Sequence, residues 1–365
     1  MKHTLRIILF CLSFASTQAV LAVEYTLETI AEGFAYPWCV EFMPDGSYLL
    51  SMRDGELRLV SADGVIGEPI ANVPDTYVAS QGGFFDVVLD PDYAQNNILY
   101  LAFAHGDVKN NATRVTKAEL NGNTLENVET VFTVSPMKRG PAHYGGKLQF
   151  LGDGTLLLTT GDGFDFREAA QDTFSQLGKI VRMNTDGSVP ADNPFADGKQ
   201  GDPMVWSYGH RSPQGLAYNP NTETVYMHEH GPMGGDEVNI VKPGNNYGWP
   251  AITYGLNYSG AYVSPFTEAP GMEQPIKQWT PSIAPSGMAY YQGDKFPAWK
   301  DSLFVGALID QEVRRLSLNG DSVSSEEALF GELGARIRDV REGPNGYLYI
   351  LTDSDEGKLV RVLPK

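Results

Sequence analysis

The chain has 365 residues, of which 42% are hydrophobic and 11% aromatic, a composition typical of a soluble protein with a sizeable core. Its 27 Lys and Arg residues face 45 Asp and Glu residues, which gives a formal net charge of −18. So acidic a chain is a poor partner for nucleic acid or for an anionic membrane surface. We therefore exclude nucleic-acid binding as a function.

The first 22 residues carry the pattern of a secretory signal. Lys2 and Arg6 precede an apolar run over residues 7–15, and small residues offer a cleavage point before Val23. That run is too short to span a membrane, so we expect an exported, soluble protein without membrane insertion. Cleavage would leave 25 basic and 45 acidic residues, a net charge of −20, with Cys39 as the only cysteine. No internal disulfide can then support the fold.

One sequence pattern occurs six times along the rest of the chain. Each copy has an apolar pair, a turn rich in Pro, Asp, Asn or Gly, and a short β-rich run, which together predict a hairpin. The copies occupy residues 40–51, 87–101, 148–158, 216–226, 288–305 (interrupted) and 340–350. Their starts lie 47 to 72 residues apart, enough for a four-stranded unit with loops. We therefore predict an all-β, six-bladed β-propeller with four-stranded antiparallel blades over residues 23–365.

The main alternative fold is a β-sandwich, which contains similar hairpins. A sandwich of this length would need two domains, and no change of composition marks a boundary between them. In the propeller, we expect the strand at residues 25–30 to pair with the strand at 358–363 and so close the ring. Functional side chains should lie in the loops next to the repeated hairpins.

His143 is the first candidate catalytic residue. It lies in a Gly-flanked loop directly before the third hairpin, and Asp162 follows the far end of the same hairpin. The two loops should therefore meet on one side of the propeller. A carboxylate there would hold the imidazole in one tautomer and raise its basicity, as a general base requires. The alternative is a histidine whose ring is bonded only by turn backbone.

Three arginines form a candidate anion site. Arg211 opens the fourth hairpin, and an arginine fork suits a planar carboxylate. Arg336 and Arg338 alternate with Ile337 before the sixth hairpin, so both should project to one side of a strand. Together they indicate a local cationic site for a polyanion or a ligand with several carboxylates. Structural ion pairs with carboxylates of neighbouring blades remain the alternative for all three.

A Gly-rich turn after the fourth hairpin is a candidate metal site. His228 and His230 alternate with Glu229 and are possible transition-metal ligands. An oxygen site for calcium is the preferred interpretation, because Asp236, Glu237 and the turn carbonyls are hard ligands.

These segments, taken in order, closely resemble the soluble quinoprotein glucose/sorbosone dehydrogenases, and most nearly their periplasmic aldose sugar dehydrogenases that use pyrroloquinoline quinone (PQQ). The resemblance runs from about Ala35 to Leu363. It rests on Gln81-Gly-Gly, His143-Tyr-Gly-Gly-Lys-Leu, Gly178-Lys-Ile-Val-Arg, Asp192-Asn-Pro-Phe, Gly209-His-Arg-Ser-Pro-Gln-Gly-Leu, His230-Gly-Pro-Met-Gly-Gly-Asp-Glu, Asn246-Tyr-Gly-Trp-Pro and Arg336-Ile-Arg.

The resemblance implies a function and a role for each of these residues. The chain would oxidise the anomeric hydroxyl of aldose sugars to the lactone in the periplasm, with PQQ and calcium as cofactors. His143 matches the general base and Asp162 the residue that orients it. The matches to PQQ contacts are Gln81, Arg211, Ser212, Tyr258, Arg336 and Arg338. The matches to calcium ligands are the carbonyls of Gly231 and Pro232 at the quinone and, at a further site, Glu237 and Tyr247. The electron acceptor is unknown, with a cytochrome or a quinone as candidates.

Two positions depart from the family pattern. Ser212 stands where the family usually has Asn, and Ile309 where many members have a Lys that touches the quinone. The departures predict weaker PQQ binding. Two other functions fit a six-bladed propeller, a calcium-dependent lactonase or esterase and a non-catalytic protein-binding module. The first would need an axial ion ringed by acidic and amide side chains, and the second would not need a His143–Asp162 pair or three clustered arginines.

Overall fold

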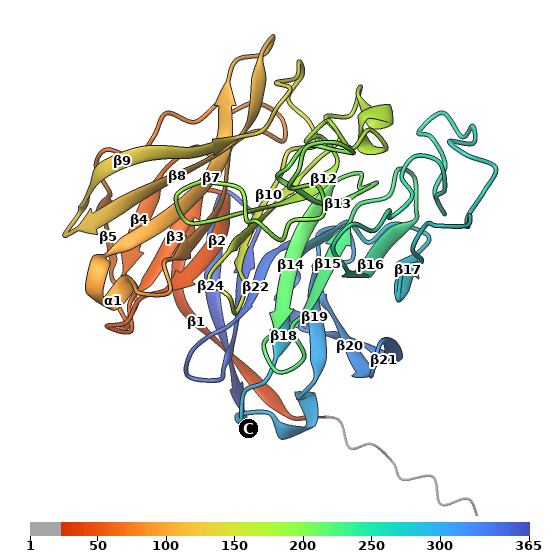
Figure 1. Ribbon diagram of the computed structural model, residues 1–365. Helices are drawn as coiled ribbons and strands as arrows, with labels where there is room; N and C mark the ends of the chain where they lie inside the picture. The colour runs from red at the N-terminus through yellow and green to blue at the C-terminus, as the bar shows by residue number, and fades with distance from the viewer. Residues whose placement is uncertain (1–22) are drawn as a thin grey trace, which may run out of the picture.

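The computed structural model describes residues 23–365, so the predicted signal over residues 1–22 lies outside the described part of the chain. The described residues form six sheets of four antiparallel strands, arranged as blades around a common axis (Figure 1). A cavity lined by residues of the innermost strands forms a channel at the centre. The six-bladed propeller predicted from the hairpin repeat is therefore confirmed. Within residues 23–365, no helix has the length and apolar character needed to cross a bilayer.

The blades are numbered here from the first complete sheet. Blade 1 consists of β2 (Pro37–Phe42), β3 (Tyr48–Met52), β4 (Leu57–Val60) and β5 (Ile66–Pro69). Blade 2 consists of β6 (Phe84–Leu89), β7 (Ile98–Gly106), β8 (Asn111–Asn121) and β9 (Thr124–Thr133). Blade 3 consists of β10 (Gly145–Phe150), β11 (Leu156–Thr160), β12 (Lys179–Met183) and β13 (Val205–Tyr208).

Blade 4 consists of β14 (Pro213–Asn219), β15 (Thr224–Glu229), β16 (Asp236–Val241) and β17 (Lys277–Trp279). Blade 5 consists of β18 (Pro285–Tyr291), β19 (Ser302–Ala307), β20 (Val313–Asn319) and β21 (Ser322–Leu329). Blade 6 consists of β22 (Ile337–Glu342), β23 (Leu348–Thr352), β24 (Gly357–Pro364) and β1 (Tyr25–Phe34). The helical segments are one α-helical turn, α1 (Tyr93–Asn96), and three 3₁₀ turns, η1 (Arg167–Ala170), η2 (Pro297–Trp299) and η3 (Gly331–Leu333).

The ring closes through the two ends of the chain, as predicted. β1 pairs antiparallel with β24, from Tyr25 opposite Pro364 to Phe34 opposite Gly357, and Figure 1 shows the two strands together. The amino-terminal strand is thus the outermost strand of the blade that the carboxyl-terminal strands build. This closure ties the ring without a disulfide, since Cys39 is buried and unpaired in the described chain.

Turn chemistry explains why the same hairpin recurs. At the tip of the first hairpin, Oδ1 of Asp45 accepts hydrogen bonds from the peptide N–H (2.9 Å) and the hydroxyl (2.6 Å) of Ser47. Asp153 binds Thr155 in the same way in blade 3, at 2.9 and 2.7 Å. A short carboxylate that bonds the backbone two residues on reverses the chain locally. The turn therefore depends on nearby residues alone, and the sequence predicts it well.

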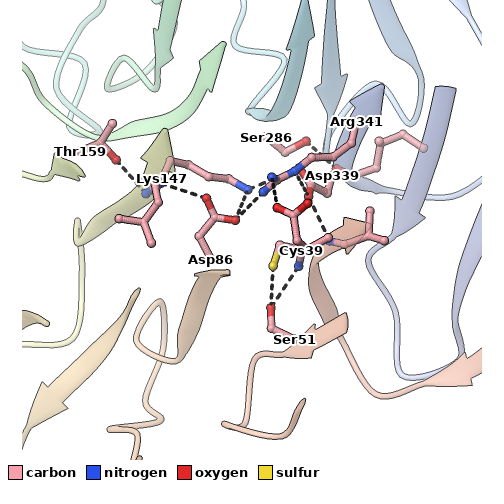
Figure 2. A network of polar contacts seen from close by, with 12 residues as sticks. Cys39, Ser51, Asp86, Lys147, Thr159, Ser286, Asp339 and Arg341 are labelled. Atoms are coloured by element: carbon pink, nitrogen blue, oxygen red, sulfur yellow. Dashed lines mark hydrogen bonds and ion pairs between the residues drawn. The ribbon is translucent and has the colours of Figure 1, made fainter. Parts of the chain in front are cut away.

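The innermost strands of the blades are β2, β6, β10, β14, β18 and β22, and successive ones contact each other around the channel. Charged side chains from these strands meet inside the channel (Figure 2). Asp86 of β6 binds the guanidinium of Arg341 and accepts the peptide N–H of Leu148 at 2.9 Å. Asp339 accepts Nε of Arg341 at 3.0 Å, and Lys147 lies 3.6 Å from Asp86 and 3.4 Å from Asp339. Ion pairs thus join blades 2, 3 and 6 at the centre of the molecule.

Candidate functional site

The innermost strands all begin at the same face of the ring, so the loops before them meet there. A main cavity of about 580 Å³ opens at this face. Its lining includes seven of the eight residues predicted for catalysis and cofactor binding: Gln81, His143, Arg211, Ser212, Tyr258, Arg336 and Arg338. The eighth, Asp162, is fully buried behind His143. The structure therefore brings together residues that are spread over more than two thirds of the chain.

His143 and Asp162 form a tightly bonded pair. Nδ1 of His143 lies 2.6 Å from Oδ1 of Asp162, which also accepts the peptide N–H of Phe164 at 2.8 Å. The other carboxylate oxygen accepts the indole N–H of Trp249 at 2.7 Å. With Asp162 held on three sides, the proton of a neutral imidazole stays on Nδ1, and Nε2 is the basic nitrogen.

Burial controls the charge of this pair. Burial lowers the pKa of His143, and although the hydrogen bond and charge of Asp162 act in the opposite direction, the net pKa remains below the ordinary value. Arg211 and Lys138 lower it further. Sequence reasoning expected the carboxylate to raise the basicity of the ring. The structure shows that desolvation outweighs that effect, which keeps the imidazole neutral and able to accept a proton near neutral pH.

Backbone geometry explains the Gly-Gly pair after His143-Tyr144. Gly145 and Gly146 have φ of +72° and +100°, a region that side chains disfavour. A β-carbon on Gly145 would lie 2.5 Å from the carbonyl oxygen of Thr159, and one on Gly146 would lie 2.5 Å from the ring of Phe85. His143 itself has φ of +50° and is held by a hydrogen bond from its peptide N–H to Oε1 of Gln81 at 2.8 Å.

The arginines of the main cavity have partners, but too few to neutralise them. Arg336 donates Nε to Asp353 at 2.8 Å, and Arg338 contacts the same carboxylate at 3.1 Å while its guanidinium lies 3.9 Å from the ring centroid of Trp38. The alternative of ion pairs with blade carboxylates is thus partly realised, with two cations sharing one anion. Among all lining residues, four arginines face two aspartates. The cavity is therefore cationic in an acidic chain.

Arg211 links the main cavity to the Gly-rich turn. Its NH1 donates to the carbonyl oxygens of Gly231 (2.6 Å) and His230 (3.1 Å), and its guanidinium lies 5.3 Å from the ring centroid of Trp249. Its Nε is buried with no hydrogen-bond partner in the described chain. Such an orphaned donor at a cavity wall is suited to an anionic ligand.

The other predicted contacts differ in position. Ser212 is buried in the lining, whereas Tyr258 is 66% exposed at the mouth of the main cavity. Ile309 is 58% exposed, and the cavity lining contains its neighbour Leu308 rather than Ile309. A side cavity of about 340 Å³ shares His143, Arg211 and Tyr258 with the main one.

The predicted metal ligands lie around the Gly-rich turn, next to two different cavities. Pro232 lines the side cavity, and the carbonyl of Gly231 accepts Arg211. A small cavity of about 20 Å³ lies between Gly231, Glu229, Glu237 and Tyr247. Burial, followed by the charge of Glu229, raises the pKa of Glu237 to about 8.

Asp236, suggested above as a hard calcium ligand, has a different role. Its Oδ1 accepts the peptide N–H of Gly231 at 2.9 Å. Its Oδ2 accepts the hydroxyl of Ser282 and the peptide N–H groups of Ile283 and Ala284, at 2.6 to 3.0 Å. The carboxylate is therefore saturated by the loops that it ties together.

The transition-metal alternative for the paired histidines also loses support. His230 bonds the carbonyl of Pro285 through Nε2 at 2.6 Å, and His228 is fully buried against Gly215. Among residues 23–365, no group of three or more His, Cys, Asp or Glu side chains is placed to hold a metal ion.

Sequence reasoning missed several residues of the site. Trp38, Arg53 and Asp353 line the main cavity, and Trp249 fixes Asp162. Trp38 had an available signal, because it follows the start of an innermost strand as Phe85 does in blade 2. No sequence signal pointed to Asp353, because it follows the end of β23, whereas the arginines that it binds lie at the start of β22.

Comparison with known proteins agrees with this arrangement. Residues 34–361 match the model of the family described as Glucose / Sorbosone dehydrogenase. The chain belongs to the glucose/sorbosone dehydrogenase family. Membership makes it an oxidoreductase of the sugar dehydrogenase type.

Individual relatives cover almost the whole chain. The aldose sugar dehydrogenase YliI of Escherichia coli is 41% identical over 363 residues, which are 98% of this chain and 97% of the relative. The crystal structure of the soluble aldose sugar dehydrogenase from Escherichia coli in the apo-form superimposes with a TM-score of 0.90, at 41% identity, over 94% of this chain and all of that one. The PQQ-bound form of the aldose sugar dehydrogenase from Streptomyces coelicolor gives a TM-score of 0.77 at 28% identity, over 93% and 99% of the chains.

Proposed function

We propose that this member of the family is a PQQ- and calcium-dependent aldose sugar dehydrogenase that oxidises the anomeric hydroxyl of an aldose to the lactone. The observation that carries the proposal is the position of the His143–Asp162 pair at the wall of a cationic cavity. Membership of the family supports the reaction class, and a relative described as PQQ-bound supports the cofactor.

The main cavity suits a planar tricarboxylate. Its volume of about 580 Å³ falls in the range of cofactor sites. Arg211, Arg336 and Arg338 would bind the carboxylates, because guanidinium forks match carboxylate geometry and the buried Nε of Arg211 needs an acceptor. Gln81, Ser212 and Tyr258 would complete the binding site. When bound, PQQ supplies a quinone that accepts a hydride.

His143 is the proposed general base. Its Nε2 would take the proton of the anomeric hydroxyl while the hydride leaves the same carbon. Asp162 would stabilise the imidazolium that forms, since it already holds Nδ1 at 2.6 Å. General-base assistance of this kind is typically worth about 10²- to 10⁴-fold in rate. The side cavity, which shares His143, Arg211 and Tyr258 with the main one, offers room for the sugar.

Calcium is proposed at two places. The carbonyls of Gly231 and Pro232 would contribute to one ion, whose Lewis acidity makes the quinone more electrophilic when both are bound. Glu237 and the region of Tyr247 would hold the other, because the partly buried carboxylate of Glu237 lines the small cavity beside Tyr247, and carboxylate oxygens are calcium ligands. Glu229 lines the same small cavity.

The channel geometry weighs against the lactonase alternative. An axial metal ringed by acidic side chains would need free carboxylates in the channel. Asp86 and Asp339 are there, but Lys147 and Arg341 already pair with them (Figure 2). A non-catalytic binding module would have no use for a buried His143–Asp162 pair.

Reconstitution tests the proposal. Addition of PQQ and calcium to the protein expressed without them should change the visible spectrum of the cofactor and produce dye-coupled oxidation of aldoses. Release of a sugar acid from lactones or esters without PQQ would favour the hydrolase instead.

We also propose export to the periplasm, on the basis of residues 1–22. The same assay, with a cytochrome or a quinone in place of the dye, tests each of them as the electron acceptor.

A further inference from the structure

Lys138 is a buried cation close to the His143–Asp162 pair. The residue is 3% exposed, and its ammonium donates to Oδ1 of Asn111 at 2.9 Å and to the carbonyl of Gly140 at 2.7 Å. Both acceptors are neutral oxygens, which compensate a buried charge only in part. Burial lowers the pKa of Lys138 to about 7, against the opposing effect of Asp162. Burial of this ammonium group costs free energy, so we looked for a role that would explain its position.

The side chain touches the loops of both members of the pair. Its ammonium lies 3.7 Å from the ring centroid of Tyr144, the neighbour of His143, and the hydroxyl of Tyr144 donates to the same Asn111 oxygen at 2.8 Å. Its stem passes beneath Gly163, the neighbour of Asp162. A β-carbon on Gly163 would lie 2.5 Å from Cδ of Lys138, so a larger residue there would displace the lysine.

The backbone of Lys138 is fixed as well. Its peptide N–H donates to the carbonyl of Asn111 at 2.8 Å and its carbonyl accepts the N–H of Asn111 at 2.8 Å. Asn111 opens β8, so the lysine is anchored to the sheet of blade 2. Because blade 3 supplies both His143 and Asp162, Lys138 connects the catalytic loops to the neighbouring blade.

We propose that Lys138 is a positioning residue of the active site, which holds the loops of His143 and Asp162 together and whose positive charge opposes protonation of His143. The inference rests on the proposed function, in which His143 acts as the base. It adds an electrostatic role that the shape of the main cavity alone does not indicate.

The charges around His143 make the sign of the effect clear. After burial, which lowers the pKa of His143, the groups that act on it are Asp162, which raises it, and Arg211 and Lys138, which lower it. His143 also faces His230, whose own pKa is lowered chiefly by burial. Lys138 lies next to the loops of both His143 and Asp162, and its positive charge lowers the pKa of His143. Removal of that charge should make His143 easier to protonate.

Two substitutions separate charge from hydrogen bonding. Lys138→Met removes the charge and the donor, whereas Lys138→Gln removes the charge and keeps a donor for Asn111. The matched control is Lys179→Met. Lys179 is another buried lysine with a pKa lowered to about 7 by burial, against the opposing charges of Asp172 and Asp162. Its ammonium donates to the carbonyls of Ala169, Ala170 and Leu177, and the charges that shift the pKa of His143 are those of Asp162, Arg211 and Lys138.

The decisive measurement is the titration of His143 by NMR of ¹³C-histidine-labelled protein without cofactor. Both Lys138 variants should raise the pKa of His143 by about half a pH unit or more, the size expected for one charge nearby in a partly buried site. The control variant should lose stability without moving this titration. In protein loaded with PQQ and calcium, the acid limb of kcat/KM should shift to higher pH by the same amount.

An unchanged His143 titration in folded Lys138→Gln would overturn the inference, even if activity fell. If Lys138→Met does not fold, Lys138→Gln alone decides the question. A wild-type protein that binds PQQ but oxidises no aldose would refute the proposed function, and the NMR titration would still establish or refute the effect of Lys138 on His143.

Discussion

Trp249 donates its indole N–H to Oδ2 of Asp162 at 2.7 Å, and so fixes from behind the carboxylate that orients His143. Both partners are buried, which makes this charge-assisted hydrogen bond costly to remove. The same indole lies against the guanidinium of Arg211, 5.3 Å from ring centroid to guanidinium carbon. One side chain therefore supports both the base and the cofactor contact.

Trp249→Phe should lower kcat by about ten- to a hundredfold, the equivalent of about 1.4 to 2.7 kcal/mol at the transition state. The ring remains in contact with Arg211, so the dissociation constant of PQQ should change less than kcat. Trp279→Phe is the control, because its indole donates to Glu326 in a different place. Equal losses of activity in the two variants would contradict a special role for Trp249.

His143→Ala and Arg338→Ala should separate catalysis from cofactor binding. Without the base, PQQ should still bind, but sugar oxidation should nearly cease. Loss of Arg338, which lies against Trp38 and shares Asp353 with Arg336, should weaken PQQ binding by roughly 1.5–3 kcal/mol, the value of a charge-assisted hydrogen bond. PQQ titration monitored by absorbance, together with turnover at saturating PQQ, measures both effects. If both variants lose bound PQQ equally, the division of roles is wrong.

Features that depend on neighbouring residues, such as the hairpin turns, can be predicted from the sequence. Contacts between distant segments cannot. The blades could be predicted because turns such as Asp45 with Ser47 form locally. That the predicted site residues lie around one cavity could be foreseen because loops before successive innermost strands must share one face. The pairing of Arg341 with Asp86, 255 positions apart, could not be foreseen from spacing.

Burial is the other property that spacing does not reveal. The pKa of His143 is lowered because the folded chain desolvates the ring, although Asp162 alone would raise it. The resemblance to the family predicts a cofactor contact at Ile309, yet Leu308 rather than Ile309 lines the main cavity. In each case the relevant quantity is set by the packed structure rather than by residue type.

Glu237 should make calcium binding depend on pH. Its folded-state pKa of about 8 lies above the value of 4.5 for an unfolded chain, so the folded protein without calcium binds the extra proton between these values. The stability of that protein should therefore fall as pH rises from about 4.5 to about 8. Calcium requires the ionised carboxylate, so the gain in Tm on adding calcium should grow over the same range.

Glu237→Gln tests this assignment. The variant should be less sensitive to pH than the wild type without calcium, and should show a smaller calcium-induced rise in Tm at pH 8. Glu273→Gln is the control, because Glu273 is exposed and bonded to Asn245. An identical calcium response in wild type and Glu237→Gln would exclude Glu237 as a ligand.

Deletion of residues 358–365 should strongly destabilise the propeller, because it removes most of β24 and leaves β1 without a partner. Arg361→Ala is the matched control, since it leaves the strand pairing intact and removes the partly exposed pair between Arg361 and Glu28 and a contact of the guanidinium with the ring of Tyr347, at 5.6 Å from the centroid. Exposed pairs of this kind contribute about 0–1 kcal/mol. Thermal unfolding should show a large loss of Tm, or no folded protein, for the deletion and a small change for the control. An unchanged Tm after deletion would mean that the ring does not depend on this closure.

Ser212 and Ile309 depart from the family pattern, and the structure shows that only Ser212 lines the main cavity. Ser212 lies in the lining of the main cavity, so Ser212→Asn would place an amide donor where the family has one. Its PQQ dissociation constant should fall, by about tenfold for each 1.4 kcal/mol gained. Ile309 is outside that lining and 58% exposed, so Ile309→Lys should gain less, and mainly at low ionic strength. Titration of each apo-variant with PQQ at fixed excess calcium measures both. A larger gain from Ile309→Lys than from Ser212→Asn would show that the loop around Leu308 rearranges when PQQ binds.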